Sequence, residues 1–217
     1  MSNLEILTFK TIEERNNALR MDLLKAYHKD GDNPFCLAIS GGSTPVSFFA
    51  YLAENPITHT KVMNVFWVDE RFVPSDDVRN NSYYPRTTWL SQEKKVQSFP
   101  VNTSLASAQE SAAAYKDAIR QVCNNRLDFV LLGMGGDGHT ASVFPGNEES
   151  MLDVFSCSHP TDGTDRISLN YSVLSAAKRV VLLIQGKEKR KVLEDYSSNL
   201  PIHKLLKMTK TVCYYID

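Results

Sequence analysis

Short apolar runs alternate with helical patterns along this chain. Six runs predict strands, at residues 35–39, 62–68, 129–132, 166–170, 180–184 and 211–216. Apolar residues at helical spacing predict helices over 12–29, 45–53, 107–122 and 187–198, with a broken helical segment at 82–90. This alternation predicts an α/β fold, a three-layer α/β/α sandwich around a mostly parallel, Rossmann-like sheet. We expect one domain over residues 1–217, in which 153–165 is an exposed connection.

Composition narrows the class of protein. The chain has 217 residues, of which 42% are hydrophobic and 23% are charged, and its net charge is -1. This balance shows no basic footprint for nucleic acid. Four widely spaced cysteines without a C-x-x-C pair argue against a zinc ribbon or a disulfide framework. No signal-like start and no long apolar run is present, so we expect a cytoplasmic protein that does not contact membranes. Nothing in the pattern indicates the oligomeric state.

The strongest chemical signal lies at 127–146, LDFVLLGMGGDGHTASVFPG. An apolar strand runs into a loop with four glycines that flank Asp137 and precede His139. Enzymes of the α/β class present chemistry at this edge of the sheet, and an imidazole changes charge near neutral pH. We therefore expect His139 and Asp137 to be catalytic.

Three other interpretations of this loop are weaker. Its glycines match the dinucleotide fingerprint G-x-G-x-x-G, but Pro145 and Gly146 leave room for only a turn or two of helix. Ser142 could be a nucleophile, although the chain has no G-x-S-x-G elbow. A metal on Asp137 and His139 would lack further ligands, because the other histidines have no ligand spacing, so we expect no metal.

A second loop, SGGSTP at 40–45, follows the strand at 35–39. Its small residues free backbone N–H groups, and a helix begins at Pro45. We expect Gly41, Gly42, Ser43 and Thr44 to bind a phosphate, although an ordinary helix cap would have the same composition. No Walker A sequence is present.

Basic residues stand at further strand ends. Arg71 follows the strand at 62–68 within Asp69-Glu70-Arg71, where three charges also suit a solvated turn. Arg166 opens the strand at 166–170, and Lys187 follows the strand at 180–184. A guanidinium binds phosphate or carboxylate well. We expect these five strand ends to converge on one edge of a parallel sheet.

The order of these motifs resembles a known family. SGGSTP (40–45), VDERFVP (68–74), LLGMGGDGHTASVFPG (131–146), RISL (166–169) and GKEK (186–189) are similar to the short, single-domain 6-phosphogluconolactonases. The resemblance covers about residues 35–193. It implies hydrolysis of 6-phospho-D-glucono-1,5-lactone, the second step of the oxidative pentose phosphate pathway, with no cofactor and a small sugar-phosphate lactone as partner.

The resemblance also implies roles for single residues. His139 corresponds to the family's proposed acid/base, with Asp137 beside it, and Arg71 lies near the substrate. The implied phosphate pocket consists of Gly42, Ser43, Thr44, Arg166 and Lys187.

Two other functions remain open at this stage. The related glucosamine-6-phosphate deaminase/isomerases carry an acidic residue five positions past the histidine, where this chain has Phe144. Asp69, however, matches an acidic position that the deaminases use. A non-catalytic sugar-phosphate sensor is the third possibility, and it predicts a damaged acid/base pair, whereas Asp137 and His139 are both present.

Overall fold

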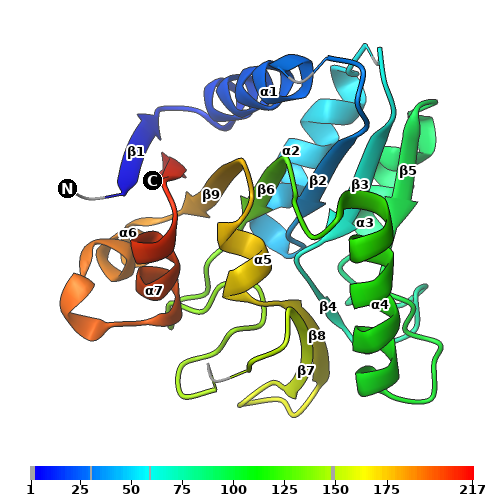
Figure 1. Ribbon diagram of the computed structural model, residues 1–217. Helices are drawn as coiled ribbons and strands as arrows, with labels where there is room; N and C mark the ends of the chain where they lie inside the picture. Colours follow the sequence, from blue (N-terminus) through cyan, green and yellow to red (C-terminus); the bar gives the residue numbers. More distant parts are fainter. Residues whose placement is uncertain (1–2, 30, 59, 148–149) are drawn as a thin grey trace.

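The computed structural model describes residues 3–29, 31–58, 60–147 and 150–217. Within these residues a seven-stranded sheet has the order β1-β10-β9-β6-β2-β3-β5, and all of its neighbouring strands are parallel (Figure 1). Its strands are β1 (Leu4–Phe9), β2 (Phe35–Ile39), β3 (Met63–Trp67), β5 (Val96–Phe99), β6 (Phe129–Leu132), β9 (Arg179–Gln185) and β10 (Thr211–Ile216).

Both faces of this sheet are buried. In β2, Phe35, Leu37 and Ile39 pack into one apolar cluster, and Cys36 and Ala38 pack into another on the opposite face. Side chains alternate along a strand, so a continuous apolar run supplies two cores. The first face is covered by α1 (Ile12–Lys29), α2 (Ser43–Glu54) and α3 (Tyr83–Thr88). The second is covered by α4 (Ala108–Cys123), α5 (Tyr171–Ser175), α6 (Lys187–Glu194) and α7 (Pro201–Met208).

The expected three-layer sandwich with a mostly parallel sheet is confirmed.

The start of α1 is defined by a local sequence signal that hydrogen-bonds to the backbone. The Thr11 hydroxyl accepts the backbone N–H of Glu14 at 3.1 Å, and the Glu14 carboxylate accepts the N–H of Thr11 at 3.3 Å. This is the reciprocal capping box, which satisfies N–H groups that the first turn leaves unpaired. No helix among the described residues is both long and apolar enough to cross a bilayer.

The chain changes direction at the middle of the sheet. After β2 it proceeds to β3 and β5 on one side, and after β6 it proceeds to β9 and β10 on the other. The loops that follow β2 and β6 therefore leave the carboxyl edge side by side and diverge, which is where open α/β sheets form ligand crevices. The Ser40 hydroxyl accepts the N–H of Gly133 at 3.0 Å and joins the two loops.

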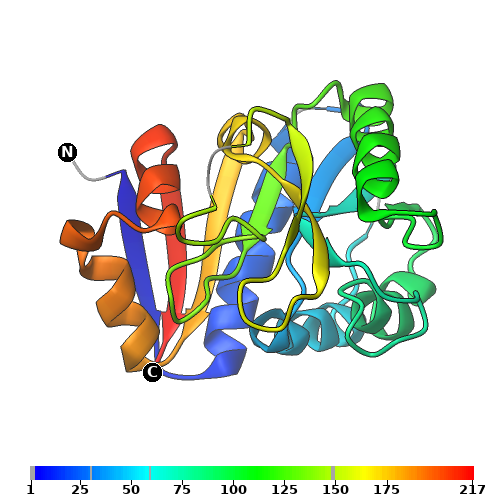
Figure 2. The same cartoon turned by 90° about the horizontal axis from the view of Figure 1, so that it is seen from below.

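A second, three-stranded sheet is the main departure from expectation. It has the order β4-β8-β7 and is antiparallel, with β4 (Asp69–Arg71), β7 (Val154–Ser158) and β8 (Asp165–Leu169). Figure 2 shows the β7–β8 hairpin, in yellow, crossing in front of the main sheet. The charged turn expected at 69–71 is thus a strand, and the connection expected at 153–165 contains another. The strand that Arg166 opens pairs with β4 instead of joining the parallel sheet.

Other elements were absent from the sequence-based prediction. These are the edge strands β1 and β5 and the short helices α5 and α7. The helix expected over 187–198 ends at Glu194 and is followed by a separate turn of 3₁₀ helix, Tyr196–Ser198. A turn of 3₁₀ helix at Leu90–Gln92 similarly follows α3, in the segment that was expected to be a broken helix.

Candidate active site

A cleft opens at the carboxyl edge of the main sheet, between the loops that follow β2 and β6. Its walls also include the start of β4 and the first turn of α6. It is lined by residues 40–45, Asp69, Arg71, Asn81, residues 133–135, His139, Ala141 and Lys189. About half of these residues are polar, and they come from five separate segments of the chain.

The loop after β6 turns back on itself so that His139 faces this cleft. The N–H of Gly135 donates to the carbonyl of His139 at 2.9 Å. A Cβ at Gly135 would overlap the His139 ring, so only glycine lets the ring lie against this backbone. Gly138 has a φ of +79°, and a Cβ there would also meet Leu200. Gly135 therefore makes room for the imidazole, and the described residues 139–147 form no helix of the kind that a dinucleotide site requires directly after its last glycine.

His139 and Asp137 form a close pair. The ring Nδ1 lies 2.6 Å from Asp137 Oδ1, which also accepts the backbone N–H of His139 at 3.2 Å. The two side chains are 30% and 49% exposed, so both reach solvent. A carboxylate can only accept, which favours a proton on Nδ1 and leaves Nε2 able to take a proton from another group. The arrangement is that of an oriented general base.

The loop after β2 brings backbone and hydroxyl groups to the opposite wall. Gly42, with a φ of +86°, precedes the first turn of α2, where Ser43 and Thr44 line the cleft. A Cβ at Gly41 would overlap the Asn81 side chain, so glycine is also required by close packing there. All four residues expected to bind phosphate, Gly41 to Thr44, line the cleft beside the positive end of α2.

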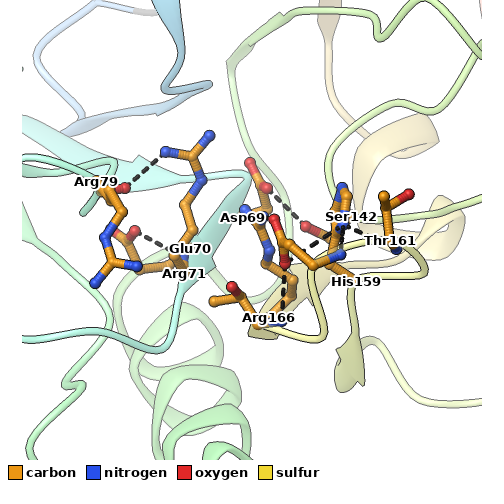
Figure 3. A network of polar contacts seen from close by, with 10 residues as sticks. Asp69, Glu70, Arg71, Arg79, Ser142, His159, Thr161 and Arg166 are labelled. Atoms are coloured by element: carbon orange, nitrogen blue, oxygen red, sulfur yellow. Dashed lines mark hydrogen bonds and ion pairs between the residues drawn. The ribbon is translucent and has the colours of Figure 1, made fainter.

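The short strand β4 contributes charge from the third side (Figure 3). Asp69 accepts a hydrogen bond from the Ser142 hydroxyl at 2.7 Å and a longer one from the Asn81 amide at 3.3 Å. Arg71 donates from Nη1 to the carbonyl of Arg79 at 2.6 Å, and its buried Nε has no partner. Ser142 is therefore bonded to a carboxylate and not to His139, and its hydroxyl is not arranged as a nucleophile.

Glu70 lies between Asp69 and Arg71 in β4, but its side chain points into the protein. Its side chain is fully buried and accepts backbone N–H groups from Arg71, Asn81 and Ser82 at 2.6–3.1 Å. Burial raises the pKa of Glu70 to about 8, although these three donors act in the opposite direction. The buried carboxyl group ties β4 to the loop that carries Asn81.

Arg166 lies outside the cleft. It is buried in an adjoining hollow that Arg71 and Arg79 also line, with Asp162 3.5 Å from one guanidinium nitrogen (Figure 3). Its Nε has no partner. Burial first, and the neighbouring Arg71 second, lower the pKa of Arg166. The cleft and the hollow share the Arg71 guanidinium.

The structure does not bring Lys187 to the cleft. The Lys187 side chain is 75% exposed and its ammonium lies 3.8 Å from the Asp217 carboxylate, whereas Lys189 lines the cleft. Residues two positions apart on a helix point in nearly opposite directions, so only one of these lysines can face the site. The phosphate role expected of Lys187 stays a prediction, and the structure places the neighbouring Lys189 at the cleft instead.

Comparison with known proteins agrees with this arrangement. The chain matches the family described as "Glucosamine-6-phosphate isomerases/6-phosphogluconolactonase" over residues 11–213. The chain belongs to this family. A Mesorhizobium japonicum protein named 6-phosphogluconolactonase is 38% identical over 162 residues, 71% of this chain and 68% of that protein. A Rhizobium meliloti protein of the same name is 35% identical over 184 residues, 79% of each. The solved 6-phosphogluconolactonase from Trypanosoma cruzi has a TM-score of 0.87 at 27% identity, covering 100% of this chain and 96% of that one.

One position in the loop bears on the two activities in the family's name. Phe144, five residues past His139, is buried, and its ring lies 5.0 Å from the His139 ring and 4.9 Å from the His159 ring. The structure thus places an apolar ring at the position where the resemblance leads us to expect an acid in a deaminase. Among the described residues, no group of three His, Cys, Asp or Glu side chains could hold a metal ion.

Asn81 and Lys189 also line the cleft, although neither was expected there from the sequence. Asn81 lies in a loop without any motif, and only the fold brings it against Gly41 and Asp69. Lys189 did have a signal, because it lies in GKEK, but the sequence alone did not show which lysine faces inward.

Proposed function

We propose that this chain hydrolyses 6-phospho-D-glucono-1,5-lactone to 6-phospho-D-gluconate. The observation that carries the proposal is the His139–Asp137 pair, which faces a cleft whose other wall is the N-terminal end of α2. One wall thus offers a general base and the other offers groups that bind a phosphate. The names of the related proteins agree with this substrate.

The proposed reaction needs one residue to move protons. Nε2 of His139 takes a proton from a water molecule, which attacks C1 of the lactone. Asp137 holds the ring and stabilises the charge that develops on it. The same imidazole then gives the proton to the ring oxygen as the ester bond opens.

Charge also develops on the carbonyl oxygen during attack. Arg71 and the backbone N–H groups of the 133–138 loop are the donors that we propose stabilise this oxyanion. Within this loop the N–H groups of Gly133, Gly135 and Gly138 already donate inside the protein, so the proposal concerns the remaining ones. Both segments reach the cleft, and the Arg71 Nε has no hydrogen-bond partner among the residues that the structure describes.

The phosphate group is assigned to the opposite wall. Gly41, Gly42, Ser43 and Thr44 supply N–H and hydroxyl groups, and Lys189 supplies a positive charge. We assign to Lys189 the role expected of Lys187. Arg166 remains a predicted phosphate residue, which would act from the hollow behind Arg71.

A deaminase/isomerase is the second candidate because Asp69 lines the cleft. Phe144 argues against the deaminase/isomerase function. It places an aromatic ring at the position where we expect that reaction to need an additional acid.

The test compares two substrates on one preparation. The lactone is generated in situ, and its hydrolysis is followed with the spontaneous rate subtracted and with EDTA present. Ammonia release from glucosamine 6-phosphate is measured in parallel. We expect fast lactone hydrolysis without ammonia release, and ammonia release without lactone hydrolysis would overturn the proposal.

A further inference from the structure

Arg15 is a fully buried cation without a counter-ion among the described residues. It lies on α1, and its guanidinium donates to the Ser47 hydroxyl at 2.8 Å and to the Asn16 side-chain oxygen at 3.0 Å. Both acceptors are neutral. Its Nη1 is buried without any partner. Asp22, by contrast, pairs with the part-buried Arg179 at 2.7 Å.

An unpaired buried charge is unfavourable for the free protein. Burial lowers the pKa of Arg15, and no carboxylate acts in the opposite direction. A guanidinium nevertheless stays protonated in proteins, so the positive charge remains. Neutral hydrogen-bond acceptors offset only part of the lost hydration of an ion. The structure around Arg15 therefore keeps a positive potential that nothing nearby cancels.

This charge lies behind the proposed phosphate site. Helix α1 packs against α2, and the Ser47 hydroxyl that accepts from Arg15 donates to the carbonyl of Thr44 at 3.4 Å. Asn16 also donates to the backbone carbonyl of Ser47 at 2.9 Å. Thr44 lines the cleft. One short hydrogen bond to Ser47 and one long one from Ser47 to Thr44 thus connect the buried cation with the first turn of α2, which lines the cleft.

The helix itself makes the same end positive. The first turn of α2 carries the positive end of the helix dipole, so Arg15 and the dipole have the same sign. The positive charge of Arg15 and the positive end of the helix dipole repel each other in the free protein. A phosphate bound at the N-terminal end of α2 would interact favourably with both and would offset this repulsion.

We propose that Arg15 is a positioning residue for the substrate phosphate, whose buried charge acts on the Gly42–Thr44 loop through Ser47. This inference rests on the proposed function, because it takes the substrate to be a phosphorylated lactone. Charges about 10 Å apart at an effective dielectric of about 20 attract with an energy equivalent to roughly tenfold in affinity.

The experiment uses two neutral variants, one charged variant and a matched control. Arg15→Met and Arg15→Gln remove the charge, and Arg15→Lys keeps it. Arg20→Met removes a guanidinium from the same helix that donates to the carbonyls of Asn55 and Pro56. We expect KM for the phosphorylated lactone to rise about tenfold in the neutral variants, with kcat within about threefold of wild type. Arg15→Lys and Arg20→Met should change KM by less than about threefold.

Thermal stabilisation by inorganic phosphate provides a readout that does not depend on turnover. The shift in melting temperature at saturating phosphate should shrink in the two neutral variants and persist in Arg20→Met. Wild type that hydrolyses no lactone would refute the proposed function, whereas the phosphate shift would still test Arg15. The inference is overturned if folded Arg15→Met and Arg15→Gln keep the wild-type KM and phosphate shift. Failure of both neutral variants to fold would assign Arg15 a purely structural role and would also overturn it.

Discussion

The two sheets that border the cleft differ in how they are stabilised. The inner strands of the seven-stranded sheet, such as β2 and β6, are buried on both faces, and β6 is apolar throughout. In the small sheet, β7 and β8 mix apolar and polar residues, and β4 consists of only three residues, all of them charged. The large sheet supplies backbone loops and the His139–Asp137 pair, whereas the small sheet supplies Asp69 and Arg71. The largely apolar main sheet thus carries the His139–Asp137 pair, and the smaller sheet adds charged side chains beside it.

This comparison predicts that the largest losses of rate come from the loop after β6. Asp137→Asn replaces a carboxylate that only accepts with an amide that can also donate to Nδ1, which disfavours the productive tautomer. We expect kcat for lactone hydrolysis to fall by roughly 10²-fold or more, with KM little changed. A kcat within about threefold of wild type would show that the pair does not act as an oriented base.

A matched pair of glycines tests the geometry of the same loop. A Cβ at Gly135 would overlap the His139 ring, whereas a Cβ at Gly136 meets no atom within 4 Å. Gly135→Ala should lower kcat by about 10–100-fold because the ring must move from its position, and Gly136→Ala should remain close to wild type. Circular dichroism of both variants controls for folding. Equal activity of the two variants would contradict the proposed position of the ring.

Substitution of the two lysines at the start of α6 should change KM, with a smaller effect than the losses of kcat predicted for the loop after β6. Lys189→Met removes a charge from the cleft, and Lys187→Met removes one that lies beside Asp217. We expect KM to rise about tenfold in the first variant and by less than about twofold in the second. Steady-state kinetics on the lactone measures both. The reverse order of effects would restore Lys187 as the phosphate residue.

We expect the free energy of unfolding to depend on pH through Glu70, the buried carboxyl group of the small sheet. Its pKa in the folded protein is raised to about 8, so the folded state holds a proton that the unfolded chain has already released. Its stabilising contribution is fully present below the unfolded pKa of about 4.5 and declines as the pH rises through about 8.

The free energy of unfolding of wild type should therefore fall relative to Glu70→Gln between about pH 5 and 8. The slope of this difference is at most about 1.4 kcal/mol per pH unit. Urea unfolding at several pH values measures it. A difference that is constant with pH would show that Glu70 has an ordinary pKa in the folded protein.

The same contrast explains what could be predicted from sequence. Continuous apolar runs such as those at β2 and β6 indicate buried strands by themselves, and the glycines mark the loops that follow. The strand β4 has no such pattern, because its stability depends on Glu70 accepting N–H groups from a loop eleven and twelve residues further along the chain. The pairing of β4 with β8 joins segments almost a hundred residues apart, and no local signal encodes it.

The residues of the candidate site also fall into two groups, those that local sequence motifs predict and those that only the tertiary packing brings to the cleft. Residues in glycine-rich loops at strand ends were found, because that combination is rare outside binding sites. Asn81 was missed since its place depends on how the loop after β4 packs against Gly41. Lys189 was missed because the orientation of α6 is set by its packing on β9 and not by the GKEK sequence.

The most direct test of the account is the initial rate of 6-phosphogluconolactone hydrolysis by wild type and by His139→Ala, with the spontaneous rate subtracted. The account predicts fast turnover by wild type and a loss of roughly 10²–10⁴-fold in kcat for a variant that still folds. A folded His139→Ala with a rate within a few-fold of wild type would contradict the assignment of His139 as the acid/base of this reaction.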